Sequence, residues 1–118
     1  MENELPAPDR VRLLHMLQAA QQALEFAAGR ERASLDQDAM FRRAVINCLQ
    51  EIGEAAVRVT EDTRRRCPSL PWNQIVGMRN RLVHVYFAIN LDLVWEALVR
   101  DLDPLVRELQ TILNSDVR

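Results

Sequence analysis

Hydrophobic residues recur every three or four positions along most of this chain, with polar residues between them. That spacing places the hydrophobic side chains on one face of an α-helix. Four such segments stand out, at about residues 9–28, 34–60, 71–84 and 90–114. The pattern predicts an all-α fold, an antiparallel bundle of four to five helices.

Residue types at the ends of these segments agree with the predicted limits. Asp9 and Asn90 are expected N-caps, and Gly29 is expected to end the first helix. Ser34 and Gln37 resemble a capping box at the start of the second helix.

Prolines bear on where the domain begins and on whether the last helical segment is continuous. Residues 1–8 contain two prolines and predict a disordered lead-in to a single domain over residues 9–114. Pro104 falls inside the last helical segment. It either kinks that helix or begins a new segment capped by Asp103, so the count of helices stays at four or five.

The hydrophobic positions on one face of each helical segment, here called its seam, also predict the core. Cys48 lies on the second seam and is interpreted as a core residue, whereas Cys67 lies in a loop without a visible partner. The positions expected to face inward are Leu13, Leu17, Ala20, Leu24 and Ala27 in the first segment, Phe41, Val45, Cys48, Ile52, Ala55 and Val59 in the second, Trp72, Ile75, Val76, Leu82 and Val83 in the third, and Leu91, Val94, Leu98, Leu102, Leu105, Leu109 and Ile112 in the last.

Composition narrows the possibilities further. A chain of 118 residues with 48% hydrophobic residues fits one domain, and three Gly among 118 residues supply too few turns for a many-stranded β fold. Two Cys and two His lack the spacing of a metal site, so no metal is expected. No apolar run approaches the roughly 20 residues that span a bilayer, and the acidic N-terminus lacks a signal-peptide pattern, so a cytoplasmic location is expected. A net charge of −2 does not by itself indicate a nucleic-acid binder.

One short stretch concentrates chemically active side chains. Within eight residues it contains Arg79, Asn80, Arg81, His84 and Tyr86. Cleavage of an RNA phosphodiester needs a proton acceptor, a proton donor and positive charge at the phosphate. Histidine supplies proton transfer near neutral pH, and arginine supplies charge and hydrogen bonds in the transition state.

Helical geometry brings only part of this set together. Asn80 and Arg81 lie four and three positions before His84 and are its neighbours on a helix. Arg79 lies five positions before His84, roughly 140° around the axis. Those two side chains converge only if the helix loosens near His84 or if two copies of the chain meet. Arg79 also falls on the apolar side of its helix, where a charge is costly unless it is paired or lies at an interface.

Simpler interpretations exist for these residues. An Arg and a His at this spacing also occur by chance, as a helix-end histidine beside a solvated arginine face. Glu54 and Arg58 are spaced for a surface ion pair within one helix.

The string RNRLVHVYF at 79–87 resembles the hallmark of the HEPN superfamily, and its His-x-Tyr resembles the HepT-like branch. The resemblance extends over about residues 10–113 and includes IGEAA at 52–56, PW at 71–72 and DLVW at 92–95. It implies a type II toxin–antitoxin component, a metal-independent endoribonuclease without a cofactor. The implied partners are an RNA substrate, a second copy of the chain and an antitoxin of the minimal nucleotidyltransferase (MNT) type.

The resemblance also implies roles for individual residues. Arg79 and His84 match the catalytic pair, while Asn80 and Arg81 are expected to orient substrate or His84. Tyr86 matches the tyrosine that MNT partners modify with AMP, and Glu54 is a candidate wall of the cleft.

Two alternatives remain open at this point. The chain could be a non-catalytic HEPN module that binds a nucleotidyltransferase or a nucleotide. It could also be a helical dimerisation domain whose motif is fortuitous.

Overall fold

The computed structural model describes residues 4–84 and 89–116, and it describes Val83 and His84 by their backbone alone. The helical elements are α1 (Ala7–Ala27), α2 (Ser34–Gln37), α3 (Ala39–Arg58), α4 (Glu61–Arg66), α5 (Trp72–His84), α6 (Leu91–Glu96), the π-helical turn η1 (Ala97–Asp101) and α7 (Leu102–Asp116). The predicted all-α fold class is therefore confirmed.

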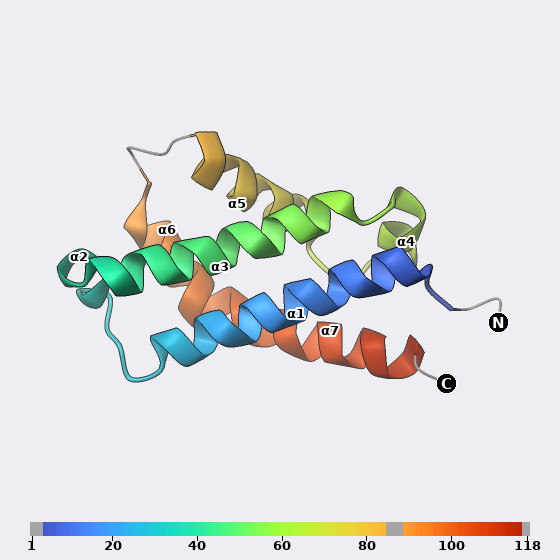
Figure 1. Ribbon diagram of the computed structural model, residues 1–118, viewed down its shortest axis with the longest axis horizontal. Coiled ribbons are helices and arrows are strands. Elements are labelled where there is room, and N and C mark those ends of the chain that lie inside the picture. The colour runs from blue at the N-terminus through green and yellow to red at the C-terminus, as the bar shows by residue number, and fades with distance from the viewer. Residues whose placement is uncertain (1–3, 85–88, 117–118) are drawn as a thin grey trace.

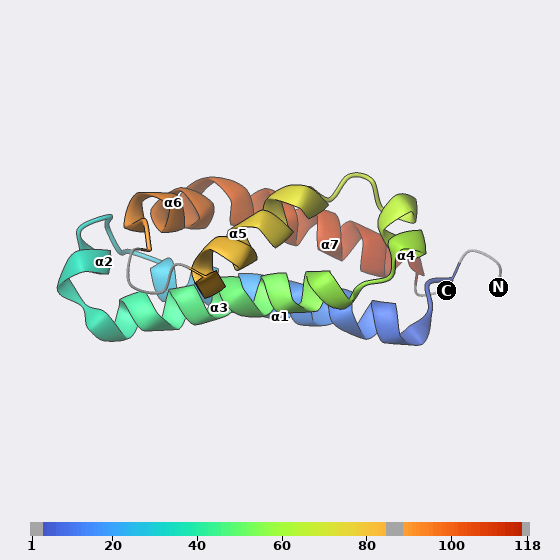
Figure 2. The same ribbon diagram turned by 90° about the horizontal axis from the view of Figure 1, so that it is seen from above.

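The long helices form an antiparallel bundle (Figures 1 and 2). α1 packs against α3 on one side and against α7 on the other, and α5 packs against α3. The short helices α2 and α4 connect the long ones at opposite ends of the bundle (Figure 1). Because α6, η1 and α7 follow one another directly, they act as one long helical unit. The bundle therefore consists of α1, α3, α5 and this α6–η1–α7 unit.

The predicted seams form the core. Most of the inward positions named above are buried, including Cys48 at 1% exposure. Seven others are only partly buried and pack against the core: Leu24, Ala27, Trp72, Ile75, Val76, Leu91 and Ile112. The side chain of Val83 lies outside the described residues. Burial, together with the nearby charge of Glu51, raises the pKa of the Cys48 thiol to about 11, so this thiol stays protonated at neutral pH. Cys67 is also buried, and both cysteines are free.

The second long helix begins later than the capping-box pattern predicted. Ser34 opens only the four-residue helix α2, and its hydroxyl accepts a hydrogen bond from the Glu31 N–H at 3.1 Å. The N-cap of α3 is Asp38, whose Oδ1 accepts from the Phe41 N–H at 3.2 Å. The prediction that Ser34 caps the long helix is wrong because Asp38 offers an equally good cap four residues later.

The last helix begins where the sequence predicted. Asn90 Oδ1 accepts hydrogen bonds from the N–H groups of Asp92 at 2.9 Å and Leu93 at 3.4 Å. No new segment begins with Asp103 as its cap, because α7 already begins at Leu102 and Pro104 lies in its first turn. The π-helical turn η1 lies just before α7. Proline has no N–H for the carbonyl four residues earlier, and a widened turn is one way for a helix to absorb that loss.

Asp9 has a different role from the predicted N-cap. α1 begins at Ala7, and Asp9 lies in its first turn with only 2% of its surface exposed. Its carboxylate accepts hydrogen bonds from the hydroxyls of Thr60 and Thr63, both at 2.5 Å, and from the Thr60 N–H at 3.1 Å. The start of α1 is thereby tied to the start of α4. Burial pushes the pKa of Asp9 upward, but these hydrogen bonds outweigh burial and the net pKa is lowered.

Replacing Thr63 with valine is expected to lower the free energy of unfolding by about 1–3 kcal/mol at neutral pH, because it removes one donor from a buried carboxylate. A carboxyl whose folded pKa is lowered stabilises the fold above its unfolded pKa, and that contribution is lost as the pH falls through the folded value. The difference between wild type and Thr63→Val should therefore shrink below about pH 4. Urea titrations at several pH values measure it.

Thr111→Val is the matched control for this experiment. Thr111 is exposed on α7, and its hydroxyl donates only to the Arg107 carbonyl of its own helix. A surface change of this kind is expected to stay within about 0.5 kcal/mol. Equal losses from both variants, or a Thr63→Val loss that does not vary with pH, would contradict the role assigned to Asp9.

Candidate active site

The site is built where α5 crosses α3, at Gly53. A Cβ atom placed on Gly53 would lie 2.1 Å from the Cβ and 2.6 Å from the Cγ of Arg79. Only a residue without a side chain fits at this distance, so Gly53 lets the base of the Arg79 side chain lie directly on α3. The close approach fixes where the Arg79 side chain leaves α5.

Glu54 then orients the guanidinium of Arg79. Arg79 Nε donates to Glu54 Oε1 at 2.8 Å, and Nη2 of Arg79 lies 2.8 Å from the same oxygen. A third donor, Arg79 Nη1, bonds to Asn80 Oδ1 at 3.0 Å. Three nitrogens of one guanidinium are thus held by two neighbouring side chains, which limits its rotation.

The ion pair with Glu54 offsets the energetic cost of placing the Arg79 charge on the apolar side of α5. The Arg79 side chain is 25% exposed and that of Glu54 is 45% exposed, so the pair lies at the edge of the core. The sequence allowed Glu54 to pair with Arg58 in its own helix, but the structure pairs it with Arg79 across two helices. Glu54 therefore contacts Arg79 directly, as a candidate wall of the site should.

Asn80 and Arg81 are both exposed on α5, beyond Arg79. Asn80 contacts Arg79, a partner that sequence reasoning did not name. α5 continues as a helix to His84, so the Cα positions of Arg79 and His84 lie roughly 140° apart around its axis. The side chain of His84, and Tyr86 entirely, lie outside the described residues.

The arginine run that precedes the site is mostly bound within the fold. Arg64 donates to the carbonyl of Ala56 at 2.9 Å and lies over the ring of Trp72, 5.6 Å from its centroid. Arg65 and Arg66 pair with acidic residues of their own helix. These contacts give the run a structural role. Arg79 and Arg81 are the arginines closest in sequence to His84.

In residues 4–84 and 89–116, no group of three His, Cys, Asp or Glu side chains is placed to hold a metal ion. No helix in that part of the chain is long and apolar enough to cross a membrane.

Comparison with known proteins gives one consistent family. Residues 16–112 match the family model described as HepT-like, "Ribonuclease HepT-like". "Putative RNase MJ1380" of Methanocaldococcus jannaschii is 33% identical over 85% of this chain and 92% of its own length. "Putative RNase TTE0752" of Caldanaerobacter subterraneus subsp. tengcongensis is 30% identical over 88% and 93%. "Probable ribonuclease HepT" of Thermococcus cleftensis is 36% identical over 52% and 56%. No solved structure matches.

Proposed function

Because the chain belongs to the HepT-like ribonuclease family, we propose that it is a metal-independent endoribonuclease whose catalytic residues are Arg79 and His84. One observation supports this most strongly. An arginine lies at the crossing of two helices, with its base against Gly53 and its guanidinium held by Glu54. These contacts hold a positively charged donor in one position at the edge of the core, which is what stabilising a transition-state phosphate requires.

The proposed reaction uses only side chains of this chain. A histidine, His84, takes the proton from the ribose 2′-hydroxyl, and the 2′-oxygen attacks the adjacent phosphorus. The bond from phosphorus to the 5′-oxygen breaks, and that oxygen takes up the proton that the protonated His84 releases, which returns the histidine to its starting state. Arg79 donates hydrogen bonds to the phosphoryl oxygens, which carry most charge in the transition state. The products are a 2′,3′-cyclic phosphate and a free 5′-hydroxyl.

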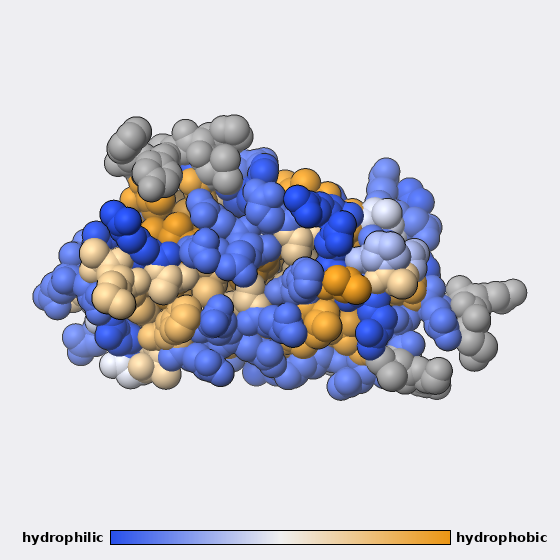
Figure 3. Space-filling view, in the orientation of Figure 1, coloured by the Kyte–Doolittle hydropathy of each residue, from blue (hydrophilic) through white to orange (hydrophobic). Residues whose placement is uncertain are grey.

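The active form in this proposal is a homodimer. Arg79 and His84 diverge around a helix that stays regular to His84, so a second subunit is the simplest way to bring them to one phosphate. Large hydrophobic side chains of α1 and α3 are also exposed, among them Val11, Met40 and Val57. Hydrophobic patches are visible on the face formed by these helices (Figure 3). Such patches favour self-association.

Purified protein is expected to cleave single-stranded RNA in the presence of EDTA, because its arginine and histidine supply the charge and the proton transfer. The products should carry 2′,3′-cyclic phosphates or their hydrolysis products, which mass spectrometry of a defined oligonucleotide identifies. His84→Ala should remove the activity by a factor of about 10² or more. Cleavage that is lost with EDTA, or kept in His84→Ala, would overturn the mechanism.

The cellular role in this proposal is that of a toxin in the cytoplasm, neutralised by an MNT antitoxin. The proposed switch is Tyr86, two residues after His84. Its phenol oxygen would attack the α-phosphorus of ATP, forming a tyrosine–AMP bond and releasing pyrophosphate. The added phosphate would occupy the arginines that RNA requires, and the nucleotide would fill the space beside them.

Incubation with the partner nucleotidyltransferase and ATP is expected to add the mass of AMP to the wild-type chain and to stop RNA cleavage. Tyr86→Phe should gain no AMP and should remain active in the same mixture. Intact-mass spectrometry and the oligonucleotide assay measure the two effects. If Tyr86→Phe is modified and neutralised as wild type is, the switch lies elsewhere.

A further inference from the structure

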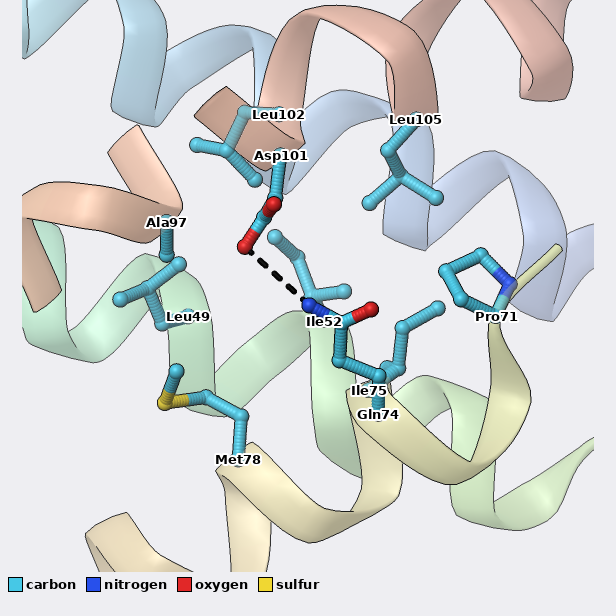
Figure 4. A pocket seen from close by; sticks show the side chains of 10 residues that line it. All are labelled: Leu49, Ile52, Pro71, Gln74, Ile75, Met78, Ala97, Asp101, Leu102 and Leu105. Atoms are coloured by element: carbon cyan, nitrogen blue, oxygen red, sulfur yellow. Dashed lines mark hydrogen bonds between the residues drawn. The ribbon is translucent and has the colours of Figure 1, made fainter. Parts of the chain in front are cut away.

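A small hydrophobic pocket lies on the side of α5 that faces α7. Its inner wall is formed by Leu49 and Ile52 of α3, and Ile75 of α5 faces Leu105 of α7 across it (Figure 4). The cavity measures about 60 Å³. A single water needs about 10–15 Å³ on the same measure, so the pocket has room for a small alkyl group.

One acid borders this pocket. Asp101, in the π-helical turn η1, accepts a hydrogen bond from Gln74 Nε2 of α5 at 3.3 Å, and this bond spans the space between the two elements (Figure 4). That distance is at the long end for an N–H···O bond. The other carboxylate oxygen has no hydrogen-bond partner among the described residues. Arg100, the neighbouring cation, is paired with Glu96 at 2.9 Å.

The charge of Asp101 is only partly compensated. Burial raises the pKa of Asp101, and the nearby Arg100 offsets this only in part. Apart from Gln74, the other residues that line the pocket are hydrophobic. A positively charged hydrogen-bond donor would stabilise this partly buried carboxylate. An alkyl group in the pocket would bury hydrophobic surface against its walls.

We infer that this pocket is a binding site for a small organic cation, with its alkyl body between α5 and α7 and its ammonium or amidinium group on Asp101. This site goes beyond the proposed nuclease function and does not depend on it. It is nevertheless connected to Arg79, because Met78, the preceding residue of α5, lines the pocket. An occupant would fill the space that separates α5 from η1 and α7.

Three probes of matched shape test the inference on the full chain: 3-methylbutylammonium, 3-methylbutanol and 4-methylpentanoate. The cation should bind about tenfold more tightly than the alcohol, the difference that one charge-assisted hydrogen bond makes, and the anion should bind least. Titrations followed by NMR of ¹³C-labelled methionine methyl groups give the affinities. The Met78 signal should shift, whereas the signal of Met16, buried on α1, should not.

Variants separate the site from nonspecific binding. Asp101→Asn should remove the preference for the cation and leave binding of the alcohol unchanged. Asp103→Asn, an exposed acid two residues later that does not line the pocket, should keep the preference. The inference is overturned if the cation and the alcohol bind equally, if the preference survives Asp101→Asn, or if Met78 does not shift. Because the readout is binding, a protein that fails to cleave RNA still gives a clear result.

Discussion

Gly53→Ala is expected to destabilise the protein by about 1–3 kcal/mol, because the new methyl group would overlap the side chain of Arg79. The added carbon would lie 2.1 Å from the Arg79 Cβ, an atom that cannot move without moving α5. The gain in helix propensity from Gly to Ala, about 0.5–1 kcal/mol, does not offset the overlap. Urea unfolding measures the loss, and RNA cleavage should fall with it because Arg79 is displaced.

Gly77 provides the matched control. It is the other glycine inside a long helix, and a Cβ placed on it would meet no atom within 4 Å. Gly77→Ala is therefore expected to stabilise the protein by about 0.5–1 kcal/mol through helix propensity alone. If both substitutions stabilise, α3 and α5 do not approach as closely as described, and the support proposed for Arg79 is absent.

The helices could be predicted from the sequence because their core residues repeat at helical spacing. Leu13, Val45 and Leu109 lie on predicted seams and are completely buried. The ends of helices were harder to predict, since a cap depends on one side chain and neighbouring candidates compete. Asn90 caps its helix as predicted, whereas Asp38 caps α3 in place of Ser34.

The candidate site could be predicted only in part. Arg79 and Glu54 were identified, but their pairing joins two helices and leaves no regular spacing in the sequence. The role of Gly53 was missed, although a glycine inside a long helix is itself a signal, because it weakens the helix unless another chain segment must approach closely. The bond between Gln74 and Asp101 likewise joins residues 27 positions apart, so periodicity within one helix does not reveal it.

Arg79→Ala is expected to lower the rate of RNA cleavage by a factor of about 10²–10³ while the protein stays folded. The guanidinium is the proposed donor to the transition-state phosphate. Its loss leaves Glu54 unpaired, but that side chain is 45% exposed and can be hydrated instead. Arg79→Lys should recover only part of the rate, since an ammonium cannot donate two parallel hydrogen bonds. Arg107→Ala, which removes an exposed arginine of α7, should leave the rate unchanged.

Mixing two inactive variants is expected to restore cleavage if Arg79 of one subunit acts with His84 of the other. Arg79→Ala and His84→Ala homodimers each lack one catalytic group at both sites. A mixed dimer has one site in which both groups are intact, because the symmetry of the interface pairs each motif with its copy. Random exchange makes half of the dimers mixed, so about a quarter of the wild-type rate should return.

The same mixture distinguishes the two ways in which Arg79 and His84 could meet. If both groups of a site come from one subunit, the intact pair does not form in any mixed dimer, and the rate stays at the level of the single variants. The expected recovery rests on the backbone of α5, whose helical geometry holds the two residues roughly 140° apart. Denaturing and refolding the variants together, followed by light scattering and the oligonucleotide assay, measures both dimer formation and rate. A mixture that forms dimers without recovering cleavage would place the catalytic pair within one subunit and would require the helix to loosen between Arg79 and His84.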